Sequence, residues 1–196
     1  MEDSTQNIDL MVRDYSRFSD LLKYKNEEIK ETKGLITHYT YDKQAVDSEP
    51  IKKNSVFDVA SYILYTLGTC SIMKLHKLLY YCQAWSLVWD ETPLFTEQIE
   101  AWANGPVVRE LFNYHRGMFS LSFSDFSIGN YSKLTDFEKE TIDSVLMFYG
   151  DKSPQWLIDQ THSELPWIKA RKGLAPMERG CRVISLTDMQ LYYSSL

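Results

Sequence analysis

The stretch from residue 72 to residue 90 constrains the fold more than any other part of the chain. Apolar side chains recur along it at helical spacing, and further apolar side chains fill the adjacent faces. The main stripe holds Leu75, Leu78, Leu79, Cys82, Trp85 and Trp89, and the adjacent faces hold Met73, Tyr80, Tyr81 and Val88. A helix that is apolar around most of its circumference has to be buried by other elements. The sequence therefore predicts a domain built around this helix, with Ser71 as its N-cap.

The composition is consistent with a core large enough to bury such a helix. Hydrophobic residues make up 44% of the 196 residues and charged residues 24%, a balance typical of folded proteins and not of disordered ones. A chain of this length buries about 70% of its extended surface on folding. The net charge of −6 argues against a general nucleic-acid binder, because an acidic chain lacks the field that attracts phosphate backbones.

Shorter helices and a minimal sheet are predicted around the central helix. Capping boxes at Thr135-x-x-Glu138 and Ser185-x-x-Asp188 mark helix starts, and Pro106 suits the first turn of another helix. The predicted helices cover residues 56–67, 106–115, 135–150, 153–162, 165–172 and 185–196. Residues 96–102 and 182–185 are expected to pair as strands, and residues 117–132 to form a long loop. The predicted fold class is mainly α: a compact helical domain around a long buried central helix, with a small two- or three-stranded sheet and an N-terminal helical extension.

Residues 1–54 differ from the rest of the chain and are predicted to form a separate extension, with residues 55–196 as the main domain. The extension contains no Trp, no Cys and a single Phe. Helical spacing of its apolar residues predicts an amphipathic helix over residues 8–33, and the polar residues 42–54 resemble a linker. Two interpretations remain open. The helix packs on the main domain, or it is an arm that a partner orders.

The sequence shows no pattern typical of a metal, cofactor or catalytic site. The cysteines Cys70, Cys82 and Cys181 form no C-x-x-C pair, and the histidines lack the close spacing of metal ligands. No glycine-rich phosphate loop is present. We therefore expect no metal, no cofactor and no enzymatic activity. The unpaired cysteines, the lack of a signal peptide and the lack of a long apolar run predict a cytoplasmic protein without a membrane partner.

Three functional interpretations compete with plain structural roles. Glu100 and His115 could act as acid and base of an enzyme, although no nucleophile accompanies them. The cluster of His162, Glu164 and Arg171 raises the same question, and helix capping with an ion pair explains it equally well. The helices over residues 56–67 and 72–90 resemble a helix-turn-helix, but the second carries Leu, Tyr and Trp where a DNA reader needs polar and basic side chains.

Several separated motifs, in order and spacing, resemble the Panacea domain family of SocA-like antitoxins and GepA-like phage-associated proteins. The resemblance covers about residues 57–196. The strings that carry it are KLHKLLYYCQAW at residues 74–85, PLF at 93–95, IEAW at 99–102, GPVV at 105–108 and THSELPW at 161–167, followed by Ala170-Arg171, Gly173, Met189 and Tyr192-Tyr193.

This resemblance implies a function that the residues alone do not. It implies the antitoxin of a type II toxin–antitoxin system, with a role in phage defence, which neutralises a cognate toxin by direct binding and blocks its active site or substrate access. The implied toxin is a translation inhibitor such as a tRNA-modifying alarmone-synthetase-like enzyme, and the chain is expected to form a homodimer or a heterotetramer with the toxin. The alternatives are a DNA-binding autorepressor, a phage-associated regulator or a proteolytic adaptor for a toxin.

Aromatic and arginine residues in two places are the candidates for partner binding, because Trp, Tyr and Arg are enriched at interface hot spots. One group lies in the extension and the other around the Gly105-Pro106 turn. The candidates are Tyr15, Phe18, Tyr39 and Tyr41 in the extension, and Trp102, Arg109, Tyr114 and Arg116 near the turn.

Overall fold

The computed structural model describes residues 54–196 and, before them, the exposed helical residues Asp20, Lys23 and Glu27. The chain divides into two units, Met1–Lys52 and Lys53–Leu196. Every element named below belongs to the second unit. Apart from those three positions and Asn54, the predicted extension lies outside the described residues, so the division into an extension and a main domain stays a prediction.

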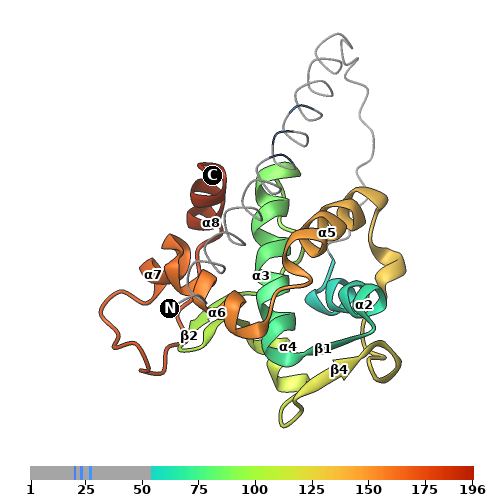
Figure 1. The fold of residues 1–196 in the computed structure, drawn as a ribbon, viewed down its shortest axis with the longest axis horizontal. Helices are drawn as coiled ribbons and strands as arrows, with labels where there is room; N and C mark the ends of the chain where they lie inside the picture. The colour runs from blue at the N-terminus through green and yellow to red at the C-terminus, as the bar shows by residue number, and fades with distance from the viewer. Residues whose placement is uncertain (1–19, 21–22, 24–26, 28–53) are drawn as a thin grey trace, which may run out of the picture. The chain divides into compact units, whose positions relative to one another are not determined.

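Helix α3 (Ile72–Trp89) is the central element, as the sequence predicts. All of its residues are buried except Met73, Lys74 and Val88. Figure 1 shows α3 running through the middle of the unit, between α2 and α5 on one side and α8 on the other. The helices packed against it are α2 (Val56–Leu67), α5 (Asp136–Tyr149), α6 (Pro154–Ser163) and α8 (Leu186–Tyr193). The mainly helical fold class is thereby confirmed.

The predicted helix starts at Ser71, Thr135 and Ser153 are confirmed by side-chain caps. The hydroxyl groups of these residues accept hydrogen bonds from backbone N–H groups in the first turns of α3, α5 and α6. At α8 only half of the predicted capping box forms. The Ser185 hydroxyl accepts from the N–H of Asp188, whereas the Asp188 carboxylate accepts from Lys169 Nζ at 2.8 Å. A neighbouring helix thus supplies the partner of this carboxylate.

A β-hairpin follows α3, and part of it corrects the sequence prediction. Strand β2 (Ile99–Trp102) pairs antiparallel with β3 (Gly105–Val108), with Trp102 opposite Gly105. The prediction that a helix starts within residues 105–108 is wrong. The chain reverses at Ala103-Asn104 and continues through Gly105 at φ +98°, a conformation that glycine adopts readily. Helix α4 is consequently short and covers Arg109–Tyr114.

A second small sheet lies partly inside the segment for which the sequence predicts a loop. Strand β1 (Thr69–Ser71) pairs antiparallel with β4 (Ser120–Ser122). Two 3-10 turns, η1 (Phe123–Asp125) and η2 (Tyr131–Lys133), follow β4. The sequence does not predict β4 because a three-residue Ser-Leu-Ser strand is too short to show alternation.

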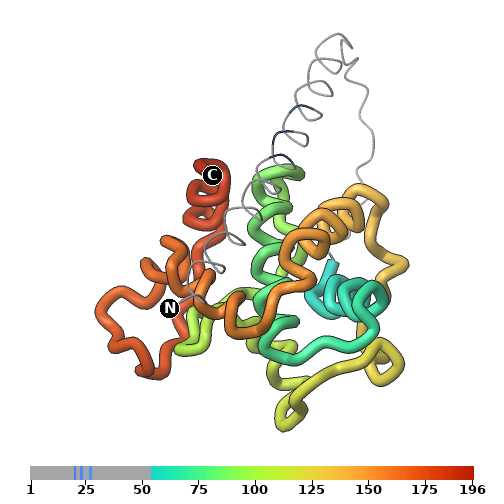
Figure 2. Tube along the Cα trace, in the orientation of Figure 1, coloured from blue at the N-terminus to red at the C-terminus, as the bar shows by residue number. Residues whose placement is uncertain are grey.

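The segment between α7 (Leu165–Ala170) and α8 returns to the hairpin after a long loop, which Figure 2 shows as an excursion of the chain. Val183 forms an isolated antiparallel bridge with Glu100, and Ala101 N–H donates to Arg182 O at 2.8 Å. The predicted pairing of residues 182–185 with the first strand is therefore present, as a bridge and not as a regular strand. Arg171 holds the loop by donating to the carbonyl oxygens of Ala101 and Glu178.

Candidate functional site

The end of the hairpin and the start of α4 form a charged and aromatic cluster around Glu100. Arg109 donates to this carboxylate with both Nε and Nη2, at 2.7 and 2.6 Å. The Trp102 indole N–H donates to the same carboxylate at 2.7 Å, and the Arg109 guanidinium lies 5.5 Å from the centre of the Trp102 ring. This bidentate geometry fixes both side chains relative to each other. The interaction with Glu100 also raises the pKa of Arg109.

Helix α4 continues this cluster with Phe112, and Arg116 follows just after the helix. Phe112 packs edge-on against Trp102 at 4.8 Å, and the Arg116 guanidinium lies 5.7 Å from the centre of the Phe112 ring. We call Trp102, Arg109, Phe112 and Arg116 the arginine–aromatic face. Phe112 is absent from the sequence prediction, yet its helical spacing from Arg109 and Arg116 is the signal that places all three on one side.

Of the four candidates near the turn, the structure brings three together. Trp102, Arg109 and Arg116 lie on the arginine–aromatic face. Tyr114 lies on another side of α4, where its ring packs against Phe57 at 6.1 Å and Phe126 at 5.4 Å. Those contacts give Tyr114 a structural role in holding α4 to α2.

The candidates Tyr15, Phe18, Tyr39 and Tyr41 lie outside the described residues. Their part in partner binding stays a prediction.

Buried polar groups of α3 form hydrogen bonds with the hairpin and with the residue that follows α4. Lys77 Nζ donates to Pro106 O at 3.1 Å, and burial lowers the pKa of this lysine to about 7. His76 Nδ1 accepts from Val108 N–H at 3.2 Å, and His76 Nε2 lies 2.8 Å from His115 Nε2. Since Nδ1 accepts, the His76 proton belongs on Nε2 and is donated to His115. Burial lowers the pKa of both histidines, so the pair is uncharged near neutral pH.

The residues considered for an enzyme are engaged in other contacts. The Glu100 carboxylate accepts hydrogen bonds from Arg109 and Trp102. The His115 side chain is 1% exposed and lies within hydrogen-bond distance of His76. Glu164 is buried, and its two oxygens accept from Tyr81 Oη at 3.1 Å and Tyr193 Oη at 2.7 Å. These groups therefore have structural roles in this fold.

The cluster around Trp167 also packs into the structure. The His162 ring stacks on Trp167 at 4.1 Å, and the Arg171 guanidinium lies 5.1 Å from the centre of the Trp167 ring. Arg171 itself is 5% exposed and donates to backbone carbonyl groups. This cluster joins α6 and α7 to the long loop.

Helix α3 cannot serve as the recognition helix of a helix-turn-helix, because it is the centre of the core. Its two lysines are both engaged by carbonyl groups, Lys74 with Gly150 O and Lys77 with Pro106 O. The interpretation of α2 and α3 as a DNA reader is therefore not supported.

The thiols and helices of the described residues bear on metal binding and membrane crossing. Cys70 and Cys82 are buried, and burial raises the pKa of the Cys70 thiol to about 11 and that of the Cys82 thiol further. Within residues 54–196, together with the three earlier described positions, no three His, Cys, Asp or Glu side chains are grouped to hold a metal ion. No helix in the described part of the chain is long and apolar enough to cross a membrane.

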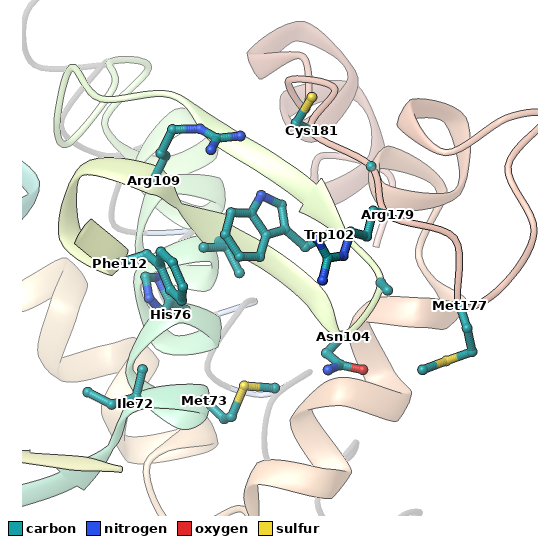
Figure 3. A pocket seen from close by; sticks show the side chains of 13 residues that line it. Ile72, Met73, His76, Trp102, Asn104, Arg109, Phe112, Met177, Arg179 and Cys181 are labelled. Atoms are coloured by element: carbon teal, nitrogen blue, oxygen red, sulfur yellow. The ribbon is translucent and has the colours of Figure 1, made fainter. Parts of the chain in front are cut away.

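A cavity of about 730 Å³ adjoins the arginine–aromatic face. Figure 3 shows Trp102 among the side chains that line it, with His76 and Phe112 on the side of α3 and α4. The opposite wall comes from the long loop before α8, which supplies Met177, Arg179 and Cys181. The cavity thus depends on three segments that are far apart in the sequence.

One comparison with known proteins gives a match. Residues 75–168 match the family model described as antitoxin SocA-like, Panacea domain. The matched segment begins in α3 and ends in α7, and it contains the hairpin and the whole arginine–aromatic face. No curated protein and no solved structure matches the chain significantly.

Proposed function

Because residues 75–168 match the family model described as antitoxin SocA-like, Panacea domain, we propose that this chain neutralises a cognate toxin by binding it directly. The family supports an antitoxin role in general. The further steps, that binding blocks the active site or substrate access of the toxin in a type II system, follow from the resemblance and form part of the proposal. A toxin that inhibits translation, for instance by modifying tRNA, is the proposed class.

We place the toxin contact on the arginine–aromatic face. Trp and Arg are the residue types that most often dominate interface energies, and here they are held in place before any partner arrives. The Glu100 carboxylate offsets the charge of Arg109. Arg116 donates only to the Asn113 amide oxygen at 3.1 Å and has no carboxylate partner in the described part of the chain. Arg116 is thus a cation of this face that no carboxylate of the described residues pairs with, although the whole chain is acidic, and it favours an acidic patch on the toxin.

Co-expression with the product of the neighbouring gene tests the antitoxin role. We expect the full chain to restore growth of cells that express this product and to co-purify with it. Light scattering of the purified chain alone then tests for a homodimer, and light scattering of the co-purified complex tests for a heterotetramer with the toxin. Growth that is not restored, together with no co-purification, would overturn the proposal.

Reversing the charge of Arg116 tests the placement of the contact. We expect Arg116→Glu to weaken binding of the neighbouring gene product by about tenfold, mainly through slower association, because a rim charge steers encounter. Biolayer interferometry at two salt concentrations measures this effect. Lys172→Glu is the matched control, because Lys172 is exposed and lies outside the face. Equal weakening in both variants, or in neither, would contradict the placement while leaving the antitoxin role intact.

Deletion of residues 1–54 tests the proposed arm. If the extension selects the partner, we expect the chain that lacks it to fold but to lose co-purification with the neighbouring gene product. Circular dichroism checks the fold of the shortened chain against the full chain. Neutralisation that survives the deletion would show that the main domain alone selects the toxin.

A further inference from the structure

The cavity beside Trp102 has the size and the walls of a small-molecule site. Its volume of about 730 Å³ is far larger than a single side chain and falls within the roughly 300–1,000 Å³ typical of ligand pockets. Ile72, Met73, Val107 and Phe112 supply an apolar wall, and the exposed Met177 lines the other side. A body of apolar or aromatic character fits this part of the cavity.

The charges around the cavity leave one cation without a partner. The Arg109 guanidinium is offset by Glu100, to which it binds bidentately. His76, which also lines the cavity, is uncharged because burial lowers its pKa and because it shares a proton with His115. Arg179 lines the cavity as well, and no carboxylate or carbonyl group in the described residues accepts from it. Among the described residues that line the cavity, Arg179 is therefore the one positive charge that no carboxylate offsets.

A polar group stands near this charge. Asn104 lies at the hairpin turn, lines the cavity, and forms no side-chain hydrogen bond within the part of the chain that the structure describes. An amide both donates and accepts, so it can bind a second polar atom of a ligand. A guanidinium can donate two parallel hydrogen bonds to two oxygens of a planar carboxylate or of a tetrahedral phosphate.

We propose that this cavity binds a small molecule with one carboxylate or phosphate group on an apolar or aromatic body. Arg179 binds the anionic group, Asn104 contacts a polar atom, and Met73 and Phe112 contact the body, with Met177 at its exposed side. This site goes beyond the antitoxin role, because it needs no protein partner. Trp102 and Arg109 belong both to the cavity wall and to the arginine–aromatic face, so an occupant would adjoin the proposed toxin contact.

Calorimetric titration of the full chain with matched probes tests the proposal. The anionic probes are 1-naphthoate and adenosine monophosphate, and their neutral counterparts are 1-naphthalenemethanol and adenosine. We expect at least one anionic probe to bind and its neutral counterpart to bind at least tenfold more weakly. Binding of naphthoate alone assigns a carboxylate ligand, and binding of the nucleotide alone assigns a phosphate ligand.

Variants of Arg179 locate the binding. We expect Arg179→Gln to weaken the anionic probe by at least tenfold, Arg179→Lys to weaken it less, and Lys172→Gln to leave it unchanged. Arg179 and Lys172 are both exposed, so thermal melts are expected to match the wild type and exclude misfolding. Binding by neither anionic probe, equal binding of the neutral counterparts, or unchanged binding in Arg179→Gln would overturn the proposal. Toxin binding is measured separately, so the two proposals fail independently.

Discussion

Replacing Gly105 by alanine is expected to lower the free energy of unfolding by about 3 kcal/mol. Gly105 has φ +98°, where a side chain is strained in any surroundings. A Cβ atom here would also lie 2.4 Å from Lys77 Cε and 3.0 Å from Thr161 Oγ1. Lys77 is 0% exposed and donates to Pro106 O, so it cannot move aside without losing this hydrogen bond in the core. Urea denaturation of the full chain measures the loss.

Gly173 offers a matched control for the crowding at Gly105. It has φ +85°, and a Cβ atom added there would meet no atom within 4 Å, so Gly173→Ala carries the backbone strain alone. We expect a loss of about 1 kcal/mol for this variant. Similar losses in both variants would show that Lys77 yields easily and that the close approach to the hairpin is unimportant.

Glu164 is expected to make the stability of the protein depend on pH between about 4.5 and 7. Burial raises the pKa of this carboxyl to about 7 from an ordinary 4.5, despite the hydrogen bonds from Tyr81 and Tyr193. The folded state therefore holds this proton more tightly than the unfolded state. The stabilisation is fully present below pH 4.5 and is lost as pH rises through about 7. The loss amounts to about 3 kcal/mol, since one pH unit corresponds to about 1.4 kcal/mol.

The variant Glu164→Gln isolates this contribution. The histidines His76 and His115 have lowered pKa values, so their stabilisation is lost as pH falls, in the opposite sense to Glu164. Burial lowers the pKa of Lys77 from 10.5 to about 7. The contribution of Lys77 to stability therefore changes above pH 7, where it is lost as pH falls from 10.5 to about 7. These groups titrate in both proteins and cancel in the difference. We expect the wild type to lose about 3 kcal/mol relative to Glu164→Gln across this range, measured by urea denaturation. A difference that does not change with pH would contradict the prediction.

The helices are predictable because their signals are local. The helical spacing of Leu75, Leu79, Cys82 and Trp89 identifies the buried helix. The start of α5 is identified by a capping box that spans only four residues, from Thr135 to Glu138. The half-formed cap at Ser185 shows where local signals stop being sufficient. Asp188 satisfies the sequence pattern of a capping box, but its carboxylate accepts a hydrogen bond from Lys169 of another helix.

The second strand of the hairpin escapes prediction because one residue carries two signals. Pro106 suits the first turn of a helix, and that interpretation outweighs the Asn104-Gly105 turn and the β-branched Val107-Val108 that favour a strand. In the structure, Pro106 pairs with Ala101, and its carbonyl accepts from Lys77. Contacts with α3 thus decide between two locally acceptable conformations.

The candidate site is predictable in its residue types and only partly in its membership. Residue type selects Trp102, Arg109 and Arg116 as candidates, because aromatic and arginine residues are enriched at interfaces. The same criterion also selects Tyr114, because residue type does not show which side of α4 a side chain occupies. The helical spacing between Arg109 and Phe112 is sufficient to predict that Phe112 lies on the same side of α4. Arg179 has no local signal at all, since it lies in an irregular loop.

The sequence by itself determined the buried central helix, most helix starts and the resemblance to the Panacea family, because periodicity, capping and motif strings all lie within short stretches of chain. Only the tertiary structure decided which charges meet. The Glu100–Arg109 pair forms because the hairpin brings the end of one strand beside the start of α4. The cavity forms because Arg171 and the Val183 bridge return the long loop to the same hairpin. Such contacts join residues far apart in sequence, and their energies exist only once the backbone has folded.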